Sequence, residues 1–287
     1  MGNSWRKEEF ESYLYHSIEK EINDTKWKEQ IMYSLKAGGK RFRPALCYKC
    51  GKALSLEQEP LYLIGSSIEL LHTASLIHDD LPEIDNDDYR RGQLSHHKQF
   101  DHGTAVIAGD FLFFLAFDLI TRLNHLDLTK YFIQCSKDLA YGEYLDITIE
   151  AEQSETQRAL LKMYDYKTAR LIEFSMTAPS IFKNKTKQHH QILKKAGQKM
   201  GIAFQILDDL KGIERTFEEI GKTPGKDLIN EKKTILSLLG IEASKQLVIQ
   251  KKQECISELN SVKTIDGTDY DNVIHYLNMI WQEIATA

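Results

Sequence analysis

Acidic residues gather in one short segment of this 287-residue chain, residues 78–92, which read HDDLPEIDNDDYRRG. Such closely spaced carboxylates repel one another unless they are solvated or share a cation. Mg²⁺ takes few protein oxygens and fills its shell with phosphate oxygens, while arginine pairs bidentately with phosphate. The segment follows an apolar run, contains Pro82 and ends in Arg90 and Arg91. These features favour a magnesium and phosphate site over the alternative, an acidic surface loop.

A second acidic pair, Asp208 and Asp209, stands far downstream at the end of another apolar run. One such pair is weak evidence, because helix ends often carry acids. Two acidic pairs, each at the end of an apolar helix, are stronger evidence for a functional site. If they face one another across a helical bundle, they can clamp several Mg²⁺ ions around one diphosphate.

Basic residues offer sites for further anions. Residues 38–44 read GGKRFRP and predict a compact anion-binding loop; the alternative is a helix C-cap with cations near the negative dipole end. Residues 221–227 contain Gly-Lys-Thr, but a phosphate-binding loop also needs a glycine at position 216, where Thr216 stands, and a preceding strand. We therefore reject that interpretation.

The elements that position these groups are predicted to be helices. Apolar residues recur at helical spacing in residues 61–77 and 192–206, and there are only five prolines. Residues 145–149 alternate like a strand, but their helical neighbours argue against one. We expect an all-α fold, a single domain spanning residues 1–287, built as a bundle with functional groups projecting inward.

Composition excludes several classes of protein. With 42% hydrophobic residues the chain can bury a core, and a formal net charge of -5 gives no support to nucleic-acid binding. Four cysteines make no disulfide scaffold, and we interpret Cys47 and Cys50 as small buried residues. The N-terminus has no apolar core for a signal peptide, and the most apolar stretch, residues 111–117, is too short for a membrane span. We expect a soluble, cytoplasmic protein.

In their order along the chain, these segments resemble the trans-isoprenyl diphosphate synthases, specifically the bacterial short-chain farnesyl and geranylgeranyl type. The resemblance runs from about residue 30 to about residue 240. It is carried by residues 33–44 (YSLKAGGKRFRP), 79–85 (DDLPEID, with a two-residue insertion that includes proline), 90–92 (RRG), 109–110 (GD), 167–168 (KT), 204–209 (FQILDD) and 221–227 (GKTPGKD).

The resemblance implies antiparallel helices around a deep apolar cavity, in an isoprenoid synthase fold that is usually a homodimer. It implies a Mg²⁺-dependent prenyltransferase that adds isopentenyl diphosphate to an allylic diphosphate. No nucleic acid and no membrane are expected as partners.

The same resemblance implies roles for individual residues. Three Mg²⁺ ions are expected to hold the allylic diphosphate, with Asp79, Asp80 and Asp85 on one side and Asp208 and Asp209 on the other. Contacts to that diphosphate are expected from Arg90, Lys167, Lys222 and Lys232. Isopentenyl diphosphate is expected to bind Lys40, Arg43, His72 and Arg91. The reacting centre is expected to include Lys167, Thr168, Gln205 and Arg90. For His72, a buried hydrogen-bonded histidine is the alternative.

Two positions depart from the family pattern. The second aspartate motif lacks its last carboxylate, because Gly212 stands there, and Glu143 occupies a position where the family commonly has glutamine. We expect Gly212 to weaken Mg²⁺ binding or slow the enzyme. The extra charge of Glu143 either offsets that loss in part or marks an altered substrate.

Product length is predicted from the residues four and five positions before Asp79, which are Ser75 and Ala74. Bacterial farnesyl synthases of this type usually place an aromatic residue at the position of Ala74, so its small size favours a C20 product. If Phe113 and Phe114 close the product cavity at a shorter depth, a C15 product is expected instead.

Three other functions remain open. A terpene cyclase shares the aspartate-rich site but has no need of a second diphosphate pocket. A peptide-modifying isoprenyl transferase tolerates a damaged second motif. A non-catalytic subunit of a heteromeric synthase generally lacks the first aspartate motif, which is complete here.

Overall fold

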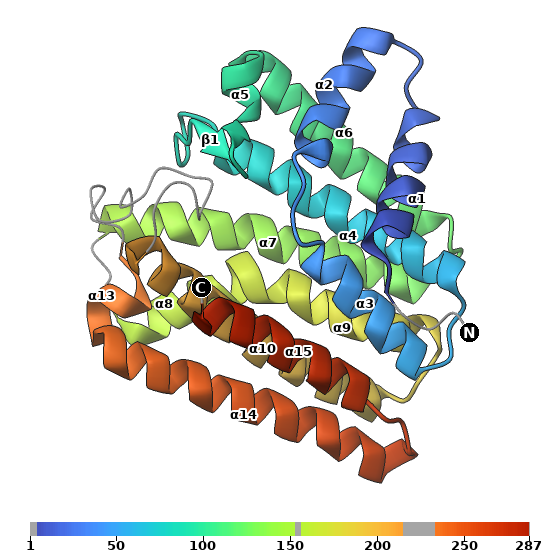
Figure 1. The fold of residues 1–287 in the computed structure, drawn as a ribbon, viewed down its shortest axis with the longest axis vertical. Coiled ribbons are helices and arrows are strands. Elements are labelled where there is room, and N and C mark those ends of the chain that lie inside the picture. Colours follow the sequence, from blue (N-terminus) through green and yellow to red (C-terminus); the bar gives the residue numbers. More distant parts are fainter. Residues whose placement is uncertain (1–4, 153–155, 215–232, 287) are drawn as a thin grey trace. The chain divides into compact units, whose positions relative to one another are not determined.

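The structure is a computed structural model that describes residues 5–152, 156–214 and 233–286. Helices form most of the described chain, and two two-residue strands form its hairpin (Figure 1). The prediction of an all-α fold is therefore confirmed. The chain groups into two compact units. Within the described residues, the first unit comprises residues 5–45 and 58–124, and the second comprises 46–57, 125–152, 156–214 and 233–286. The single domain over residues 1–287 stays a prediction.

The first unit is built around its longest helix. Its elements are α1 (Lys7–Glu19), α2 (Thr25–Lys36), α4 (Gln58–Asp79), β1 (Tyr89–Arg90), β2 (Gln93–Leu94), α5 (His96–Gln99) and α6 (His102–Thr121). Helix α4 is buried along most of its length and lies beside α6 (Figure 1). Its core positions Leu61, Ile64, Ile68 and Leu71 are almost completely buried, and they repeat at the spacing that predicted the helix. Helix α3 (Phe42–Ala53) gives its first residues to this unit and the rest to the second.

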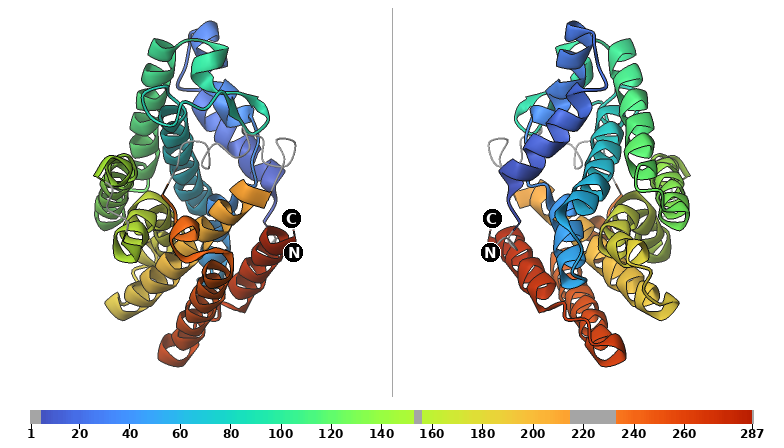
Figure 2. Two further views of the ribbon diagram at one scale, coloured as in Figure 1. Left: turned by 90° about the vertical axis from the view of Figure 1, so that its left-hand side faces the viewer. Right: turned by 90° about the vertical axis from the view of Figure 1, so that its right-hand side faces the viewer.

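The second unit packs three long helices against shorter ones. Its elements are α7 (Leu126–Glu152), α8 (Gln157–Tyr164), η1 (Asp165–Ala169), α9 (Arg170–Phe182), α10 (Lys187–Glu214), α13 (Ile235–Leu239), α14 (Ile241–Asp266) and α15 (Asp271–Thr286). Helix α10 lies beside both α9 and α14 (Figures 1 and 2). The segment η1 is one turn of π-helix, an irregularity that is frequent at functional sites.

Short polar side chains cap the N-termini of several helices. Asp24, Asp101 and Thr156 accept hydrogen bonds from the backbone N–H groups three residues ahead, at 2.7, 2.8 and 3.2 Å. These bonds satisfy amides that have no partner inside the helix. The boundaries of α2, α6 and α8 therefore follow from local sequence.

Helix α6 is the one helix in the described chain that is long and apolar enough to span a membrane by length and composition. Its mean hydropathy is 1.8, and 44% of the window is buried inside the protein. The apolar stretch therefore extends beyond the residues 111–117 identified in the sequence. Core helices pass the same test, and α6 packs on α4 in the first unit.

Two local predictions are confirmed. Residues 145–149 lie within α7 and not in a strand. Cys47 and Cys50 are fully buried thiols. Burial raises the pKa of the Cys50 thiol, which is typical of an inert structural cysteine.

Glycine lets α10 approach the π-turn closely. A Cβ on Gly201 would lie 2.3 Å from Ala169 Cα and 2.4 Å from Ala169 Cβ. Alanine normally stabilises a helix relative to glycine by about 1 kcal/mol. We predict the opposite for Gly201→Ala, a loss of about 1–3 kcal/mol in the free energy of unfolding, because the added methyl forces the backbones apart.

Urea unfolding followed by far-UV circular dichroism measures this change. Gly103→Ala in α6 is the matched control, because its new Cβ would meet only a carboxylate oxygen of Asp101, at 3.3 Å, and the end of that side chain can move by a few tenths of an ångström. A Gly201→Ala protein as stable as the parent would contradict the close approach.

Candidate active site

The acidic segment folds back onto the C-terminal end of α4. The amide of Asp85 donates to the carbonyl of Asp79 at 2.8 Å, and that of Asp87 donates to the carbonyl of Asp80 at 3.1 Å. These bonds satisfy carbonyls that a helix end leaves without a partner. They also hold Asp85 close to Asp79, as the sequence motif predicts. A helix C-terminus carries partial negative charge, so carboxylates there strengthen the attraction for a cation.

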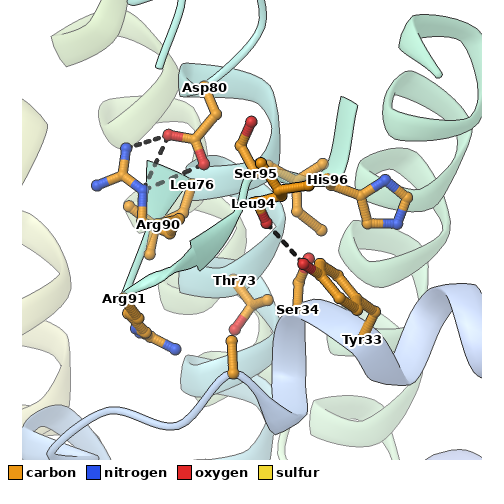
Figure 3. Close-up of a pocket in the computed structure, with 12 residues that line it drawn as sticks. Tyr33, Ser34, Thr73, Leu76, Asp80, Arg90, Arg91, Leu94, Ser95 and His96 are labelled. Atoms are coloured by element: carbon orange, nitrogen blue, oxygen red, sulfur yellow. Dashed lines mark hydrogen bonds and ion pairs between the residues drawn. The ribbon is translucent and has the colours of Figure 1, made fainter. Parts of the chain in front are cut away.

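Arg90 covers Asp80. Its guanidinium Nε donates to Asp80 Oδ1 at 2.9 Å and to Oδ2 at 3.1 Å (Figure 3). Its Nη2 lies 3.4 Å from Asp87 Oδ2. Asp80 is only 2% exposed, whereas Asp79 and Asp85 are partly exposed. Burial opposes the charge of Arg90, but the neighbouring Asp80 and Asp87 carboxylates outweigh it and raise the pKa of Arg90. The buried pair leaves Asp79 and Asp85 as the more accessible carboxylates of the motif.

A two-residue turn separates the two arginines. Tyr89 pairs with Leu94 and Arg90 with Gln93, so Arg91 and Gly92 form the hairpin turn. Both have positive φ, 56° and 78°, as a type I′ turn requires. While Arg90 faces the acidic segment, Arg91 Nη1 donates to the carbonyl of Gly38 at 2.5 Å. The turn therefore directs adjacent arginines to different groups.

The basic loop meets α4 through an arginine and a histidine. Arg43 Nη1 lies 3.2 Å from His72 Nε2. Because a guanidinium only donates, Nε2 is the acceptor and the proton of the neutral ring is on Nδ1. Burial, followed by the charges of Arg43 and Arg91, lowers the pKa of His72 well below its usual value. His72 is therefore a neutral imidazole among cations.

A small cavity opens between α2, α4 and the hairpin (Figure 3). Its volume of about 20 Å³ has room for about one water molecule and is far too small for a diphosphate. Asp80, Arg90 and Arg91 line it together with Thr73 of α4. The hydroxyl of Thr73 is buried without a hydrogen-bond partner in the part of the chain that the structure describes.

Lys167 lies in the π-turn of the second unit. Its ammonium is 2.9 Å from Glu143 Oε2 and also donates to Asp146, both on α7. The α7 helix and η1 can approach closely because Gly142 has no side chain. A Cβ at this position would lie 2.2 Å from the amide nitrogen of Lys167. Two carboxylates therefore share one lysine, and one of them is the glutamate that departs from the family pattern.

A chain of hydrogen bonds runs from the π-turn to the second aspartate pair. Thr168 Oγ1 donates to Gln205 Oε1 at 2.5 Å, and Gln205 Nε2 donates to Asp209 Oδ1 at 2.9 Å. Tyr164 donates its hydroxyl to Asp209 Oδ2 and accepts from the amide of Ile235 at 3.0 Å. Burial, then the Asp209 carboxylate, raises the pKa of Tyr164. Asp209 is thus engaged by protein groups on both oxygens, while Asp208 is exposed.

The structure brings the expected site residues together in two sets, one in each unit. The first unit contains the acidic segment with Arg90, and it contains His72 with Arg43 and Arg91. The second unit contains Lys167, Thr168, Gln205 and the second aspartate pair. The two predicted lysines Lys222 and Lys232 lie outside the described residues.

The positions expected to set product length differ in exposure. Ala74 is fully buried, and Ser75 is partly exposed and donates to the carbonyl of His72 at 3.0 Å. On α6, Phe113 contacts the ring of His78, with 5.5 Å between the ring centroids. Phe114 is 71% exposed on the surface of the first unit. The roles of all four in product length stay predictions.

Tyr164 is a site residue that sequence analysis missed. It stands three residues before Lys167, and the α8 helix with the following π-turn places its hydroxyl on Asp209. An aromatic residue at helical spacing is indistinguishable in sequence from a core residue. A hydroxyl three residues ahead of an expected site lysine was the one available signal.

Comparison with known proteins identifies the family. The family model described as polyprenyl synthetase matches residues 24–266. The chain is 40% identical over 259 residues to a farnesyl diphosphate synthase of Micrococcus luteus, which covers 88% of this chain and 87% of that one. It is 36% identical over 262 residues to a geranylgeranyl diphosphate synthase of Cyanophora paradoxa, covering 87% of each chain. The chain belongs to the polyprenyl synthetase family, and its resemblance to short-chain isoprenyl diphosphate synthases is confirmed.

The fold matches solved structures of the same kind. A geranyltransferase of Helicobacter pylori, complexed with magnesium and isoprenyl diphosphate, superposes with a TM-score of 0.82 at 30% identity. The match covers 98% of this chain and 95% of that one. The fold of this chain is therefore the isoprenoid synthase fold.

The residues of the acidic segment fit a magnesium ion in their chemistry. Asp79 and Asp85 offer carboxylate oxygens, the ligands that Mg²⁺ prefers, at partly exposed positions held together by a backbone hydrogen bond. Asp80 fits less directly, because Arg90 engages both of its oxygens. Asp209 is likewise engaged by Tyr164 and Gln205.

Glu143 offers a test of the electrostatics around Lys167. We predict that Glu143→Gln tightens the binding of inorganic diphosphate in the presence of Mg²⁺, because Lys167 then shares its charge with one carboxylate fewer. Partly exposed ion pairs are worth up to about 1 kcal/mol, so the expected change in Kd is about twofold to fivefold.

Isothermal titration calorimetry of the purified protein measures this Kd. Glu143→Asp keeps the charge and is the matched control, with an expected Kd near that of the parent. Weaker binding by the glutamine variant would show that Glu143 supports the anion site instead of competing for Lys167.

Proposed function

We propose that this protein condenses isopentenyl diphosphate with an allylic diphosphate to make a short-chain all-trans prenyl diphosphate. Its relatives include farnesyl and geranylgeranyl diphosphate synthases, which supports short-chain synthesis. The observation that carries the proposal is the hairpin turn. It directs Arg90 to the acidic segment and Arg91 to the basic loop, so one unit supplies two distinct cationic positions. A reaction between two diphosphates needs two such positions.

The proposed reaction makes one carbon–carbon bond. The C–O bond of the allylic diphosphate breaks and the diphosphate leaves with the electron pair. The double bond of isopentenyl diphosphate attacks the allylic carbon, and the released diphosphate takes the proton that is then lost. The chain grows by five carbons. An apolar surrounding protects the allylic cation from water.

The expected site residues have proposed roles in that reaction. The magnesium ligands are Asp79, Asp85 and Asp208, with Asp80 and Asp209 as supporting carboxylates. When bound, Mg²⁺ supplies positive charge that stabilises the departing diphosphate. Cationic contacts to that diphosphate come from Arg90, Lys167, Lys222 and Lys232. Isopentenyl diphosphate binds Lys40, Arg43, His72 and Arg91, while Thr168 and Gln205 face the reacting carbons.

The proposed assembly is a homodimer in the cytoplasm. Helix α6 carries Val106, Ile107 and Phe114, which are 40%, 57% and 71% exposed. Helix α7 carries Ile133, Tyr141 and Tyr144, also exposed. A second copy of the chain would remove these apolar side chains from water.

The proposed product is geranylgeranyl diphosphate, with farnesyl diphosphate as the alternative. Ala74 and Ser75 are small residues on α4, one turn before Asp79. Small side chains at these positions leave room for a longer tail.

One incubation tests the function. The purified full-length protein is given Mg²⁺, labelled isopentenyl diphosphate and allylic diphosphates of increasing length, and the products are sized. We expect incorporation of label, and no incorporation with EDTA. A terpene cyclase would release a hydrocarbon without consuming isopentenyl diphosphate. A protein that incorporates no label with any of the primers would contradict the proposal, and activation of a co-expressed synthase would then identify a non-catalytic subunit.

Product length has its own test. We predict that Ala74→Phe shifts the main product to a shorter chain, since an aromatic ring at this position fills the space of the terminal isoprene unit. Ala74 is fully buried, so a phenylalanine there can disturb folding as well as product length. Ser75→Phe is therefore made in parallel, because Ser75 is partly exposed. If both variants are folded and release the same product as the parent, the wall that sets chain length lies elsewhere.

A further inference from the structure

The basic loop contains one arginine that has no role in the proposed function. Arg41 stands between Lys40 and Arg43, yet its side chain is completely buried in the first unit. Every guanidinium nitrogen donates to a protein acceptor. Nε donates to Glu11 Oε1 at 2.8 Å, Nη1 to Glu69 Oε1 at 2.6 Å, and Nη2 to the carbonyl of Leu35 at 2.5 Å and the hydroxyl of Tyr15 at 3.2 Å. A substrate cannot reach it.

The network ties the loop to three helices. Glu11 and Tyr15 lie on α1, Leu35 lies at the end of α2, and Glu69 lies on α4. Glu69 is itself only 2% exposed. Burial opposes the charge of Arg41, but the Glu69 carboxylate beside it raises the pKa of Arg41. The pair therefore stays ionised, and its bonds are strong because they are charge-assisted and shielded from water.

The backbone of the loop needs such an anchor. Arg41 has φ of 47°, a left-handed conformation that side chains other than glycine rarely adopt. A strained residue of this kind persists only where the surrounding contacts determine its position. The preceding Gly38 and Gly39 also have positive φ, 89° and 122°.

Two residues of the loop bind successive positions on one face of α4. Arg41 pairs with Glu69, and Arg43 contacts His72, three residues further along the helix. Residues three apart lie on the same helix face. Fixing Arg41 on Glu69 therefore fixes the register at which Arg43 meets His72.

The other end of the loop is held by the hairpin. Arg91 donates to the carbonyl of Gly38, and a Cβ on Gly39 would lie 2.9 Å from Arg91 Cζ. The loop is thus held at both ends before any substrate binds.

We propose that the buried Arg41–Glu69 pair is a positioning device that preforms the isopentenyl diphosphate site by fixing the loop of Lys40 and Arg43 against His72 and Arg91. Arg41 touches no substrate and acts through its neighbours. The inference rests on the proposed function, because it assigns the basic loop to isopentenyl diphosphate.

Steady-state kinetics with each substrate varied in turn tests the inference. In Arg41→Lys the charge remains but the fork of donors is lost. We expect the KM for isopentenyl diphosphate to rise by about tenfold or more, since small misplacements of binding groups are costly. The KM for the allylic diphosphate and the Mg²⁺ dependence should stay within twofold of the parent. Glu69→Gln, which removes the charge of the acceptor, should give the same split.

Arg122→Lys is the matched control. Arg122 forms ion pairs with Glu21 and Asp118 on the surface of the same unit and has no part in the site. Both KM values should match those of the parent. Equal rises in both KM values for the Arg41 variant, or no rise in either, would overturn the inference.

A milder variant covers the case in which Arg41→Lys does not fold, because a broken buried pair can unfold a protein. Glu11→Gln changes the charge of a partly exposed acceptor and should raise only the KM for isopentenyl diphosphate, by about twofold to fivefold. An unchanged KM in this folded variant contradicts the inference. If the parent protein itself consumes no isopentenyl diphosphate, the proposed function has failed and not the positioning role alone.

Discussion

The rest of the site depends on negative charge held at the C-terminal end of α4. Asp79 and Asp80 stand where the helix dipole is already negative, and the backbone of the following segment brings Asp85 beside them. Left alone, this cluster would repel itself. Arg90 balances part of it by covering Asp80, and the remaining carboxylates keep the attraction for a divalent cation. The hairpin that carries Arg90 is therefore part of the electrostatics of the helix end.

Two cations of the site, Arg90 and Lys167, are paired with carboxylates in the structure, and so is the buried Arg41 of the basic loop. Arg90 has Asp80, Lys167 has Glu143 and Asp146, and the buried Arg41 has Glu69. Arg43 differs, because His72 beside it is neutral. Under the proposed function, a diphosphate competes with carboxylates at Arg90 and Lys167, whereas beside Arg43 lies the uncharged ring of His72. This difference gives the two predicted diphosphate positions distinct electrostatic characters.

Sequence alone predicted the helices well and the contacts between side chains poorly. The apolar spacing of residues 61–77 predicts α4, and the motif order identifies the family, because both are properties of residue type and interval. The contact between Arg90 and Asp80 could not be predicted from the sequence. It depends on a two-residue turn whose positive φ values reverse the chain. The same holds for Tyr164, whose contact with Asp209 joins positions 45 residues apart. Residue type alone also does not separate the buried Arg41 from Lys40 and Arg43 of the same loop.

The π-turn between α8 and α9 limits which single-residue deletions the sequence can tolerate. A five-residue turn accommodates one more residue than an α-helical turn, and Lys167 and Thr168 lie within it. Removing a single residue there would restore an unbroken α-helix at little local cost. Residues inside the turn would, however, move around the helix axis by up to about 100°, the angle per residue in an α-helix. Lys167 and Thr168 could not both keep their partners, so single-residue deletions should be absent from this turn in functional relatives, although helices elsewhere tolerate length changes at their ends.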